Sequence, residues 1–260
     1  MSMSKWCILA GLCAMAVGSI CVVQASAQTE AVKAKAPMYS YISNWQIPRA
    51  HWNEMKNEAA AEKEIMDKAM ADGTLVGYGS DQNLVHTEDG WTHDDWFASN
   101  SLGGLMTVLK QLYASGTSTS EVLATATRHY DLVMMSRYYG WHSGSYKDGI
   151  VSVSAYKLKK DAPDQALDAI GGEVVAPLLE KLLADGTIAE YEIDTMAVHT
   201  AAPGSFWIVT VVNDPANLDK VEDAIRAAIK AHPIEGAGFD AMTDPSGHRD
   251  EMGLGSGTFK

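Results

Sequence analysis

Hydrophobic and polar positions alternate along several short stretches of the chain, and apolar residues recur at helical spacing between them. Residues 150–158 alternate between aliphatic and hydroxyl-bearing side chains, which is the period of a half-buried strand. In residues 162–185, Val175, Leu178 and Leu182 share one helical face. The chain is therefore predicted to mix strands and helices throughout.

The same succession of patterns occurs twice, at an offset of 113 residues. The string ADGT at 71–74 returns at 184–187, and VHT at 85–87 returns at 198–200. The register between these strings is unbroken over about forty residues, which indicates an internal duplication. Further matches in this register are Lys68 with Lys181, Tyr78 with Tyr191, Asp81 with Asp194, Asn100 with Asn213, Leu105 with Leu218 and Val108 with Val221.

Each copy is predicted to run strand, helix, strand, strand, helix. Gly73 and Gly186 follow the first helices, at the position where a left-handed residue ends a helix. The second predicted strand of each copy is long for a globular domain, so we expect each to contain a β-bulge or bend. Gly77 and Gly79 would permit one in the first copy. The ranges are 38–45, 48–72, 74–86, 92–100 and 102–114 in the first copy, and 150–158, 162–185, 187–199, 206–213 and 215–231 in the second.

These ranges place the first repeat at residues 38–114 and the second at 150–231. Between them, residues 115–149 are predicted to form a helical connector, because Ser118 precedes Glu121 at the spacing of a capping box. The C-terminal tail, residues 232–260, ends in a glycine-rich stretch and is expected to be loosely ordered. It nevertheless echoes the connector, since a His-x-Asp string occurs in both, at His129 and Asp131 and at His248 and Asp250.

The first residues have the three-part layout of a secretory signal. Lys5 precedes an apolar run at 6–23, and small residues end at Ala27. We expect residues 1–27 to be a signal peptide cleaved near Ala27, residues 28–37 to be a flexible lead-in, and the mature protein to be periplasmic or secreted without membrane contact. An uncleaved membrane anchor is the alternative, because eighteen apolar residues approach the shortest bilayer span.

Removal of this leader changes the composition of the mature chain. Its three cysteines, Cys7, Cys13 and Cys21, all lie in the leader, so no disulfide is expected. Loss of Lys5 leaves 19 basic and 33 acidic residues, a formal charge of −14. This charge would repel a polyanion and argues against nucleic acid as a partner. Solubility explains the charge, and an acidic binding face is the other explanation.

Two such units would have helices on one side of each sheet, and the simplest cover for each bare face is the other copy. This arrangement resembles the ferredoxin-like, dimeric α+β barrel superfamily, here fused into one chain. We therefore expect an α+β fold in which two ferredoxin-like βαββα repeats pack as a pseudo-symmetric intramolecular α+β barrel. The ADGT and VHT strings, followed by a Gly-containing turn and a Trp, also resemble an uncharacterised family of exported bacterial proteins.

The duplication makes His86 and His199 equivalent, with Tyr78 and Tyr191 further along the same strands. If the two sheets face each other, these side chains could share a cavity. The alternative is that each histidine ends a strand and bonds to a turn carbonyl. Neither a second ligand at metal-site spacing nor a His-x-x-x-His string is present, so no metal site is expected.

The copies differ most in their third strands. His93, Asp94 and Asp95 stand where the second copy has Phe206, Trp207 and Ile208, by the offset of 113. One interpretation is that only the first copy keeps a working polar site. The other is that this strand is a sheet edge with polar side chains facing solvent.

Aromatic residues gather in the first copy, at Trp45, Trp52, Trp91 and Trp96, near Asn44. The resemblance implies that Asn, Trp, Tyr and His inside the barrel hold an oxidisable aromatic substrate, as in cofactor-independent monooxygenases. No phosphate-binding loop or nucleophile elbow is present. The residues expected to bind a ligand are Asn44, Tyr78, His86, His93, Trp96, Tyr191, His199 and Trp207.

Three functions remain open at this point. The first is binding of a small apolar or aromatic ligand between two pseudo-symmetric sheets, the second a monooxygenase-type oxidoreductase, and the third a structural or partner-binding module of the envelope. No cofactor is predicted, and haem is the one cofactor that the resemblance allows. The sequence leaves the oligomeric state open.

Overall fold

The computed structural model describes residues 30–55, 58–85, 90–116 and 120–260. The predicted signal peptide and the candidate residue His86 lie outside these ranges. Within them, no helix combines the length and the apolar character needed to span a bilayer.

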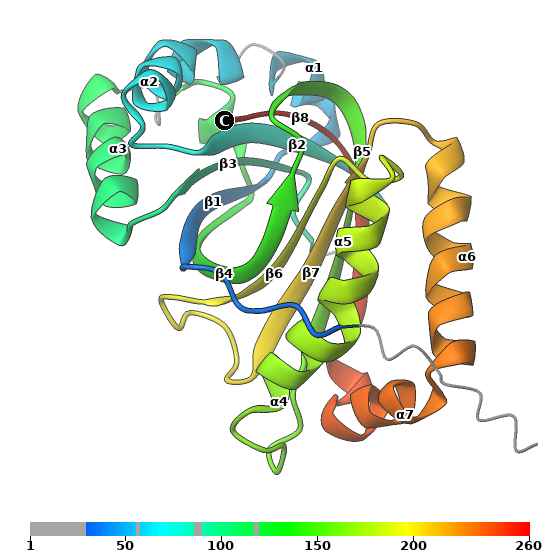
Figure 1. Ribbon diagram of the computed structural model, residues 1–260. Helices are drawn as coiled ribbons and strands as arrows, with labels where there is room; N and C mark the ends of the chain where they lie inside the picture. The colour runs from blue at the N-terminus through cyan, green and yellow to red at the C-terminus, as the bar shows by residue number, and fades with distance from the viewer. Residues whose placement is uncertain (1–29, 56–57, 86–89, 117–119) are drawn as a thin grey trace, which may run out of the picture.

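The described residues form one closed antiparallel barrel (Figure 1). Its strand order is β1-β3-β2-β8-β5-β7-β6-β4, and β4 pairs with β1 to complete the ring. Each half of the chain contributes four neighbouring strands, and the halves join where β2 pairs with β8 and β4 pairs with β6. The strands are β1 (Met38–Gln46), β2 (Gly77–Val85), β3 (His93–Ser99), β4 (Arg128–Trp141), β5 (Gly144–Lys157), β6 (Glu190–Met196), β7 (Ser205–Val212) and β8 (Arg249–Phe259).

Our expectation of two ferredoxin-like βαββα repeats packed as an α+β barrel is therefore wrong. The eight strands close into a single barrel instead of two sheets lying face to face. Two of the eight strands, β4 and β8, lie in stretches that were not predicted to be strands. The stretch expected to be a helical connector contains β4, and the tail expected to be loosely ordered contains β8.

Helices cover the outside of the barrel on two sides (Figure 1). The first half carries α2 (Glu58–Asp72) and α3 (Leu102–Ser115), and the second carries α5 (Ala176–Ala184) and α6 (Ala216–Ala231). Gly73 and Gly186 have φ angles of 82° and 76°, which confirms that both stop a helix in the left-handed conformation. The shorter helices are α1 (Trp52–Met55), α4 (Ala166–Asp168) and α7 (Pro233–Met242), with a π-helical segment at Ala169–Val175 and 3-10 turns at Arg49–His51, Leu123–Thr125 and Pro245–Gly247.

The hydrophobic core lies between these helices and the outer face of the barrel. In the first half, Phe97 of β3 packs with Leu75 and with Leu105 of α3. In the second half, Tyr191 of β6 packs with Leu179 and Leu182 of α5. A fully buried side chain of this size contributes about 1.5–3 kcal/mol to stability. These two clusters therefore bury apolar side chains outside the barrel, while apolar and polar side chains both line its inside.

The two halves repeat the same polar contact between barrel and helix. The hydroxyl of Tyr78 donates to Asp67 at 2.7 Å, and that of Tyr191 donates to Glu180 at 2.6 Å. Tyr78 and Tyr191 are 113 residues apart, and so are their partners Asp67 and Glu180, which is the offset of the duplication. Tyr78 and Tyr191 thus hold helices to strands on the outer face.

A second repeated contact involves the two His-x-Asp strings. Ser43 donates to Asp131 at 3.2 Å, and Ser154 donates to Asp250 at 2.6 Å. His129 stacks on Trp45 with ring centroids 3.7 Å apart, and His248 stacks on Tyr156 at 4.5 Å. The echo between connector and tail is confirmed, because both strings begin the fourth strand of their half.

β3, the strand that carries His93, Asp94 and Asp95, is not a sheet edge. β3 pairs with β1 on one side and β2 on the other, so the edge interpretation is wrong. The bulge expected in β2 is present, but its register shifts between Asn83 and Val85. Gly77 and Gly79 have a different role, since a Cβ at these positions would lie 2.6 Å from the rings of Phe259 and Trp96.

Candidate functional site

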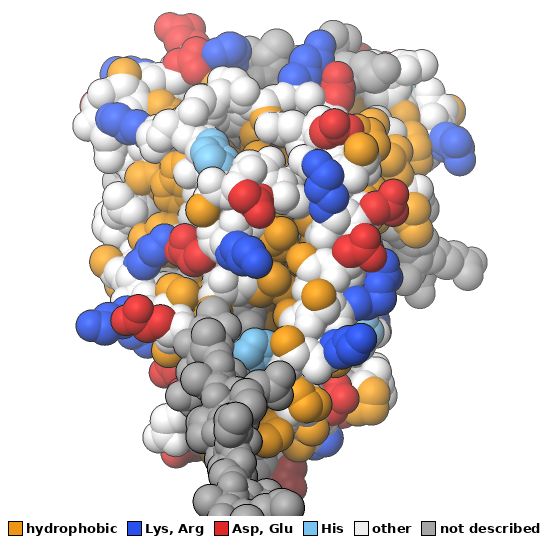
Figure 2. All heavy atoms as spheres, turned by 45° about the vertical axis from the view of Figure 1, so that its right-hand side comes forward, with side chains coloured by type: hydrophobic (Ala, Val, Ile, Leu, Met, Phe, Trp, Pro, Cys, Tyr) orange, Lys and Arg blue, Asp and Glu red, His pale blue; other side chains and the backbone are white. Residues whose placement is uncertain are grey.

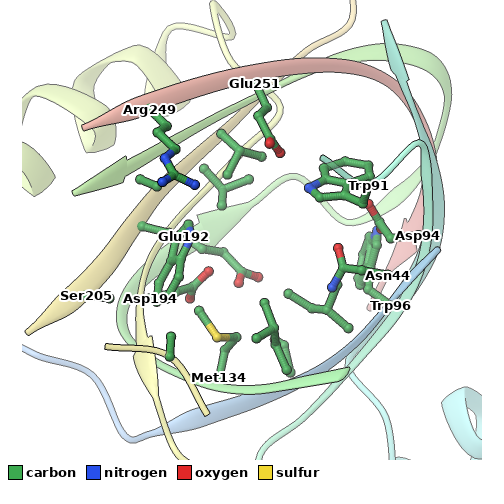
Figure 3. A pocket seen from close by; sticks show the side chains of 18 of the residues that line it. Asn44, Trp91, Asp94, Trp96, Met134, Glu192, Asp194, Ser205, Arg249 and Glu251 are labelled. Carbon is green, nitrogen blue, oxygen red and sulfur yellow. The ribbon is translucent and has the colours of Figure 1, made fainter. Parts of the chain in front are cut away.

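A cavity of about 720 Å³ occupies the inside of the barrel (Figure 3). All eight strands contribute inward-facing side chains to it. Part of the wall is aliphatic, and this part is formed by Ile42, Leu132, Met134, Val151, Val153, Val209 and Val211. The lining reaches the surface at Thr200, Ala202, Ser246 and Arg249, which are exposed and therefore give the cavity a route to solvent.

Aromatic rings close the opposite part of the barrel. Phe259 stacks against Trp96 at 5.3 Å and against Trp141 at 5.0 Å between ring centroids. Tyr146 lies 6.3 Å from the same ring. The glycines of β2 and β8 make room for these rings, since a Cβ on Gly257 would come within 2.8 Å of Tyr146.

The most unusual feature of the cavity is its acidity. Three of its carboxyl groups come from β6, whose polar face points inward. Figure 3 shows Glu192 and Asp194 on one wall and Asp94 on the opposite wall. The acidic residues that line the cavity from the barrel strands are Asp81, Asp94, Asp131, Glu190, Glu192, Asp194 and Glu251.

Asp81 and Asp94 are cross-strand neighbours. They are directly paired in the register of β2 and β3, and Asn44 is paired with Asp94 in the register of β1 and β3. Burial raises the pKa of Asp81 to about 7, although hydrogen bonds with Asp94 and Trp96 oppose the rise. Burial, and then the charges of Asp81 and Asp95, raise the pKa of Asp94 well above its usual range. Two coupled carboxyls of this kind share a proton near neutral pH.

Burial acts on the carboxyls of β6 in the same direction. Burial raises the pKa of Asp194 to about 6, and it raises the pKa values of Glu190 and Glu192 well above their usual range. Ser136 of β4 donates hydrogen bonds to Asp194 and, at 3.3 Å, to Glu192. The carboxyl groups of Glu192 and Asp194 are therefore held in position by a hydroxyl group on the neighbouring strand.

Some polar atoms of the lining have no hydrogen-bond partner among the residues that the structure describes. These atoms are Ser40 Oγ, Asn44 Nδ2, Asp81 Oδ1 and Glu190 Oε2. Asn44 and Glu190 are only 3% and 4% exposed. A buried polar atom without a partner costs about 1–3 kcal/mol, so these atoms call for a donor or acceptor from outside the chain.

Asp81 owes its position to a glycine on the neighbouring strand. A Cβ at Gly255 of β8 would lie 2.0 Å from Asp81 Oδ1, so no other residue fits there without moving the carboxyl group. The register places Asp81 directly opposite Gly255. The glycine-rich tail is thus part of the site.

The residues expected to bind a ligand fall into three groups. Asn44, Trp96 and Trp207 line the cavity. Tyr78, Tyr191 and His93 lie on the outer face, where His93 contacts the edge of Trp52 and burial lowers its pKa to about 4. His199 is exposed between β6 and β7. The expected pairing with His86 concerns a residue outside the described ranges.

The carboxyl groups were missed as site residues, although two signals pointed to them. Glu190, Glu192 and Asp194 alternate along one strand, and Asp81 matches Asp194 at the offset of the duplication. Alternation shows that a strand has a polar face, but not that this face is enclosed.

The lining offers some of the residue types that hold haem iron. Haem iron is held by a histidine, cysteine, methionine or tyrosine, and the described residues that line the cavity include Met134, Tyr130, Tyr146 and Tyr156 but no histidine or cysteine. The carboxyl groups would, however, lie close to the anionic propionates of haem. Across the described part of the chain, no three His, Cys, Asp or Glu side chains are placed to hold a metal ion.

Solved structures with a similar fold include proteins connected with oxidation and haem. A protein from Lactobacillus acidophilus, provisionally assigned as a monooxygenase, has a TM-score of 0.62 at 11% identity, over 85% of this chain and 94% of that chain. A second such protein, from Fusobacterium nucleatum, has a TM-score of 0.58 at 11% identity, over 87% and 95%. A heme-binding protein from Thermus thermophilus has a TM-score of 0.50 at 11% identity, over 86% and 93%.

No protein-family model matches the chain, and no curated protein matches it. At these identities, the likeness to solved structures establishes the fold alone. The chain thus shares the barrel fold of these structures.

Proposed function

We propose that the protein is an oxidoreductase of the monooxygenase type, which oxidises a small aromatic molecule inside the barrel. The observation that carries this proposal is the Asp81 and Asp94 pair, a proton-sharing couple that lies beside Asn44 and Trp96 in the barrel cavity. Two of the solved structures with the same fold are assigned provisionally to this class.

The carboxyl pair supplies the base that such a reaction needs. A carboxylate with a pKa near 7 can accept a proton at neutral pH and return it later. Trp91 and Trp96 offer flat walls for an aromatic substrate on the same side of the cavity (Figure 3). Proton removal would leave an electron-rich substrate anion in a space with little water.

Asn44 can then stabilise that anion. Its Nδ2 group is buried and has no acceptor within the protein, so it is free to donate a hydrogen bond to a substrate oxygen. The electron-rich substrate reacts with O₂ itself. A ring methylene group and O₂ give a carbonyl group and water, so the carbon gains one oxygen atom, and the second oxygen atom leaves with the two hydrogens. The substrate supplies all the electrons.

Oxygen uptake tests the proposal. The substrates would be hydroxylated aromatic compounds with a ring methylene group, with and without an amino substituent, and quenching of tryptophan fluorescence would report their binding. We expect Asp94→Asn to lower the rate about 10²–10⁴-fold, the usual contribution of a positioned base. The matched control is Asp164→Asn, which changes an exposed aspartate outside the cavity.

Equal rates in wild type and Asp94→Asn would overturn the role of the pair. Binding of the compounds without oxygen uptake would overturn the oxidoreductase and leave a protein that only binds its ligand.

We also propose that the protein acts outside the cytoplasm, because a lysine, an apolar run and small residues precede the barrel. N-terminal sequencing of protein from an envelope or culture fraction tests this. A mature chain that starts near Gln28 is expected, and an intact Met1 would contradict it.

A further inference from the structure

The charge of the cavity differs from that of the surface. On the face shown in Figure 2, acidic and basic side chains are interspersed with apolar ones, so neither sign dominates. Inside the barrel, seven acidic residues of the strands line the cavity, while Lys157 and Arg249 are the basic residues among the described lining. Arg249 is exposed, at the end where the lining reaches solvent.

The acidic groups surround one space. The charges of Glu190, Asp81, Asp94 and Glu192 all act on the hydroxyl of Tyr146, whose pKa burial raises well above its usual range. The charge of Asp81 likewise raises the pKa of Glu190, although the two residues come from different halves of the chain. The carboxyls of the two walls are therefore close enough to act on the same bound group.

Two of these carboxyls have an oxygen that receives no hydrogen bond. Asp81 Oδ1 and Glu190 Oε2 are buried and without a partner, while other carboxyl oxygens of the cavity are bonded to Ser136 or Asn83. Carboxyl oxygens are satisfied by hydrogen-bond donors, and most strongly by charged ones. A donor-rich group between the two walls would satisfy these atoms, and a positively charged one would do so most strongly.

The aromatic part of the lining favours the same kind of molecule. Trp91, Trp96 and Trp207 line the cavity together with Tyr130 and Tyr146. The face of an indole ring attracts an ammonium group when the group lies within about 6 Å of it, and it also stacks on an aromatic ring. Carboxylates and indoles together recognise organic cations.

We propose that the ligand of the barrel cavity is a small aromatic amine, bound as a cation, with its ammonium group between Asp81 and Glu190 and its ring against the tryptophans. This inference names the substrate class for the cavity of the proposed function, and it rests on that proposal only for the site. Binding of the amine is measurable whether or not oxygen is consumed.

The charge state of the carboxyls gives the proposal a second signature. In the absence of ligand, burial raises the pKa values of Asp81 and Glu190 and so favours their protonated forms. A bound ammonium group favours the ionised carboxylates, so binding should release protons to the solvent. Affinity should then rise with pH up to the pKa of the amine.

Three ligands with the same ring test the inference on the wild-type protein: 2-phenylethylamine, 2-phenylethanol and phenylacetate. Titration calorimetry at pH 7 should show that the amine binds at least tenfold more tightly than the alcohol and that the acid binds least. Repeating the titration in buffers with different ionisation enthalpies should show release of protons. Equal or tighter binding of the alcohol or the acid overturns the inference.

Variants locate the ammonium group. Asp81→Asn and Glu190→Gln should each weaken amine binding at least tenfold and leave binding of the alcohol unchanged, whereas Glu173→Gln, an exposed residue outside the cavity, should change neither. Equal losses for amine and alcohol would contradict the assignment. If a cavity variant fails to fold, the ligand series on the wild type decides.

The two proposals fail in different ways. Amine binding without oxygen uptake would contradict the proposed oxidoreductase activity and support the amine site. Oxidation of neutral aromatic compounds, together with no preference for the amine, would contradict the amine site and support the oxidoreductase activity.

Discussion

The two halves of the barrel keep the same outer contacts but have different inner faces. In the first half, the cross-strand row is Asn44, Asp94 and Asp81; in the second half, the same row is Ala155, Trp207 and Asp194. Asp81 and Asp194 are thus equivalent carboxyls, but the cross-strand partner of Asp81 is the acid Asp94, whereas that of Asp194 is Trp207. The duplicated strands and helices therefore enclose one cavity whose two walls carry different side chains.

The inner faces differ in a second respect. Gly77 and Gly79 of β2 stand where β6 has Glu190 and Glu192, by the offset of 113. The glycines accommodate the rings of Phe259 and Trp96, whereas the glutamates extend carboxyls into the cavity. The wall from the first half therefore carries aromatic rings next to the Asp81 and Asp94 pair. The wall from the second half carries a row of carboxyl groups along β6.

The largest effect is expected where the first half depends on glycine. In Gly79→Ala, the new Cβ would lie 2.6 Å from both the ring of Trp96 and the backbone oxygen of Ser256, so the strands must move apart. We expect the free energy of unfolding to fall by about 2–3 kcal/mol, the upper part of the usual range for overpacking. Urea denaturation measures the change.

Gly103→Ala is the matched control, because nothing lies within 4 Å of a Cβ at that position in α3. Alanine also favours a helix over glycine, so this variant should be unchanged or slightly more stable. A Gly79→Ala protein as stable as wild type would show that the wall of the first half is not packed as described.

The pH dependence of stability tests whether both walls hold neutral carboxyls. Asp81 and Asp194 have raised pKa values of about 7 and about 6 in the folded state. The folded protein therefore binds more protons than the unfolded chain above about pH 4, so stability is highest near pH 4 and is lost as pH rises through these values. The expected slope is on the order of 1 kcal/mol per pH unit between pH 5 and 7.

Asp81→Asn and Asp194→Asn should each flatten this slope, because each removes one group that ionises on unfolding. The exposed acids with lowered pKa values, such as Asp72 and Asp185, contribute in the opposite direction only below about pH 4. Chemical denaturation at several pH values measures the slope. A stability that rises from pH 5 to 7 would contradict neutral carboxyls on either wall.

The smallest expected effect compares the outer contacts that the halves share. Tyr191 is fully buried and its hydroxyl bonds to Glu180, so Tyr191→Phe should cost about 1–2 kcal/mol. Asp67, the partner of Tyr78, has a side chain that is 53% exposed and is also paired with Lys63, so Tyr78→Phe should cost less than about 0.5 kcal/mol. Thermal or urea unfolding of the two variants side by side would show the difference. Equal losses would mean that burial does not distinguish the two contacts.

The sequence by itself determined the local elements that depend on neighbouring residues. Periodicity located the strands near β1, β2, β3 and their counterparts, and Gly73 and Gly186 marked two helix ends. The offset of 113 revealed the doubled order of elements. The aromatic residues and the resemblance to monooxygenases pointed to Asn44, Trp96 and Trp207, which the structure places in the cavity.

Only the tertiary structure decided the remaining strands and the character of the site. β4 lies in a stretch with a capping-box spacing, and β8 is rich in glycine, a poor strand former, so neither is specified locally. Each exists because it pairs with strands on both sides, and β8 bridges the two halves between β2 and β5. Such pairing is invisible to a local pattern.

The same reason explains why the carboxyl groups were missed. Alternation in β6 separates Glu190, Glu192 and Asp194 from the apolar face, and such a polar face ordinarily meets water. Here the helices cover the apolar faces from outside, and closure of the barrel turns the polar faces toward one another. Local sequence decides which side chains share a face, and the closure of the sheet decides that these carboxyls are buried together.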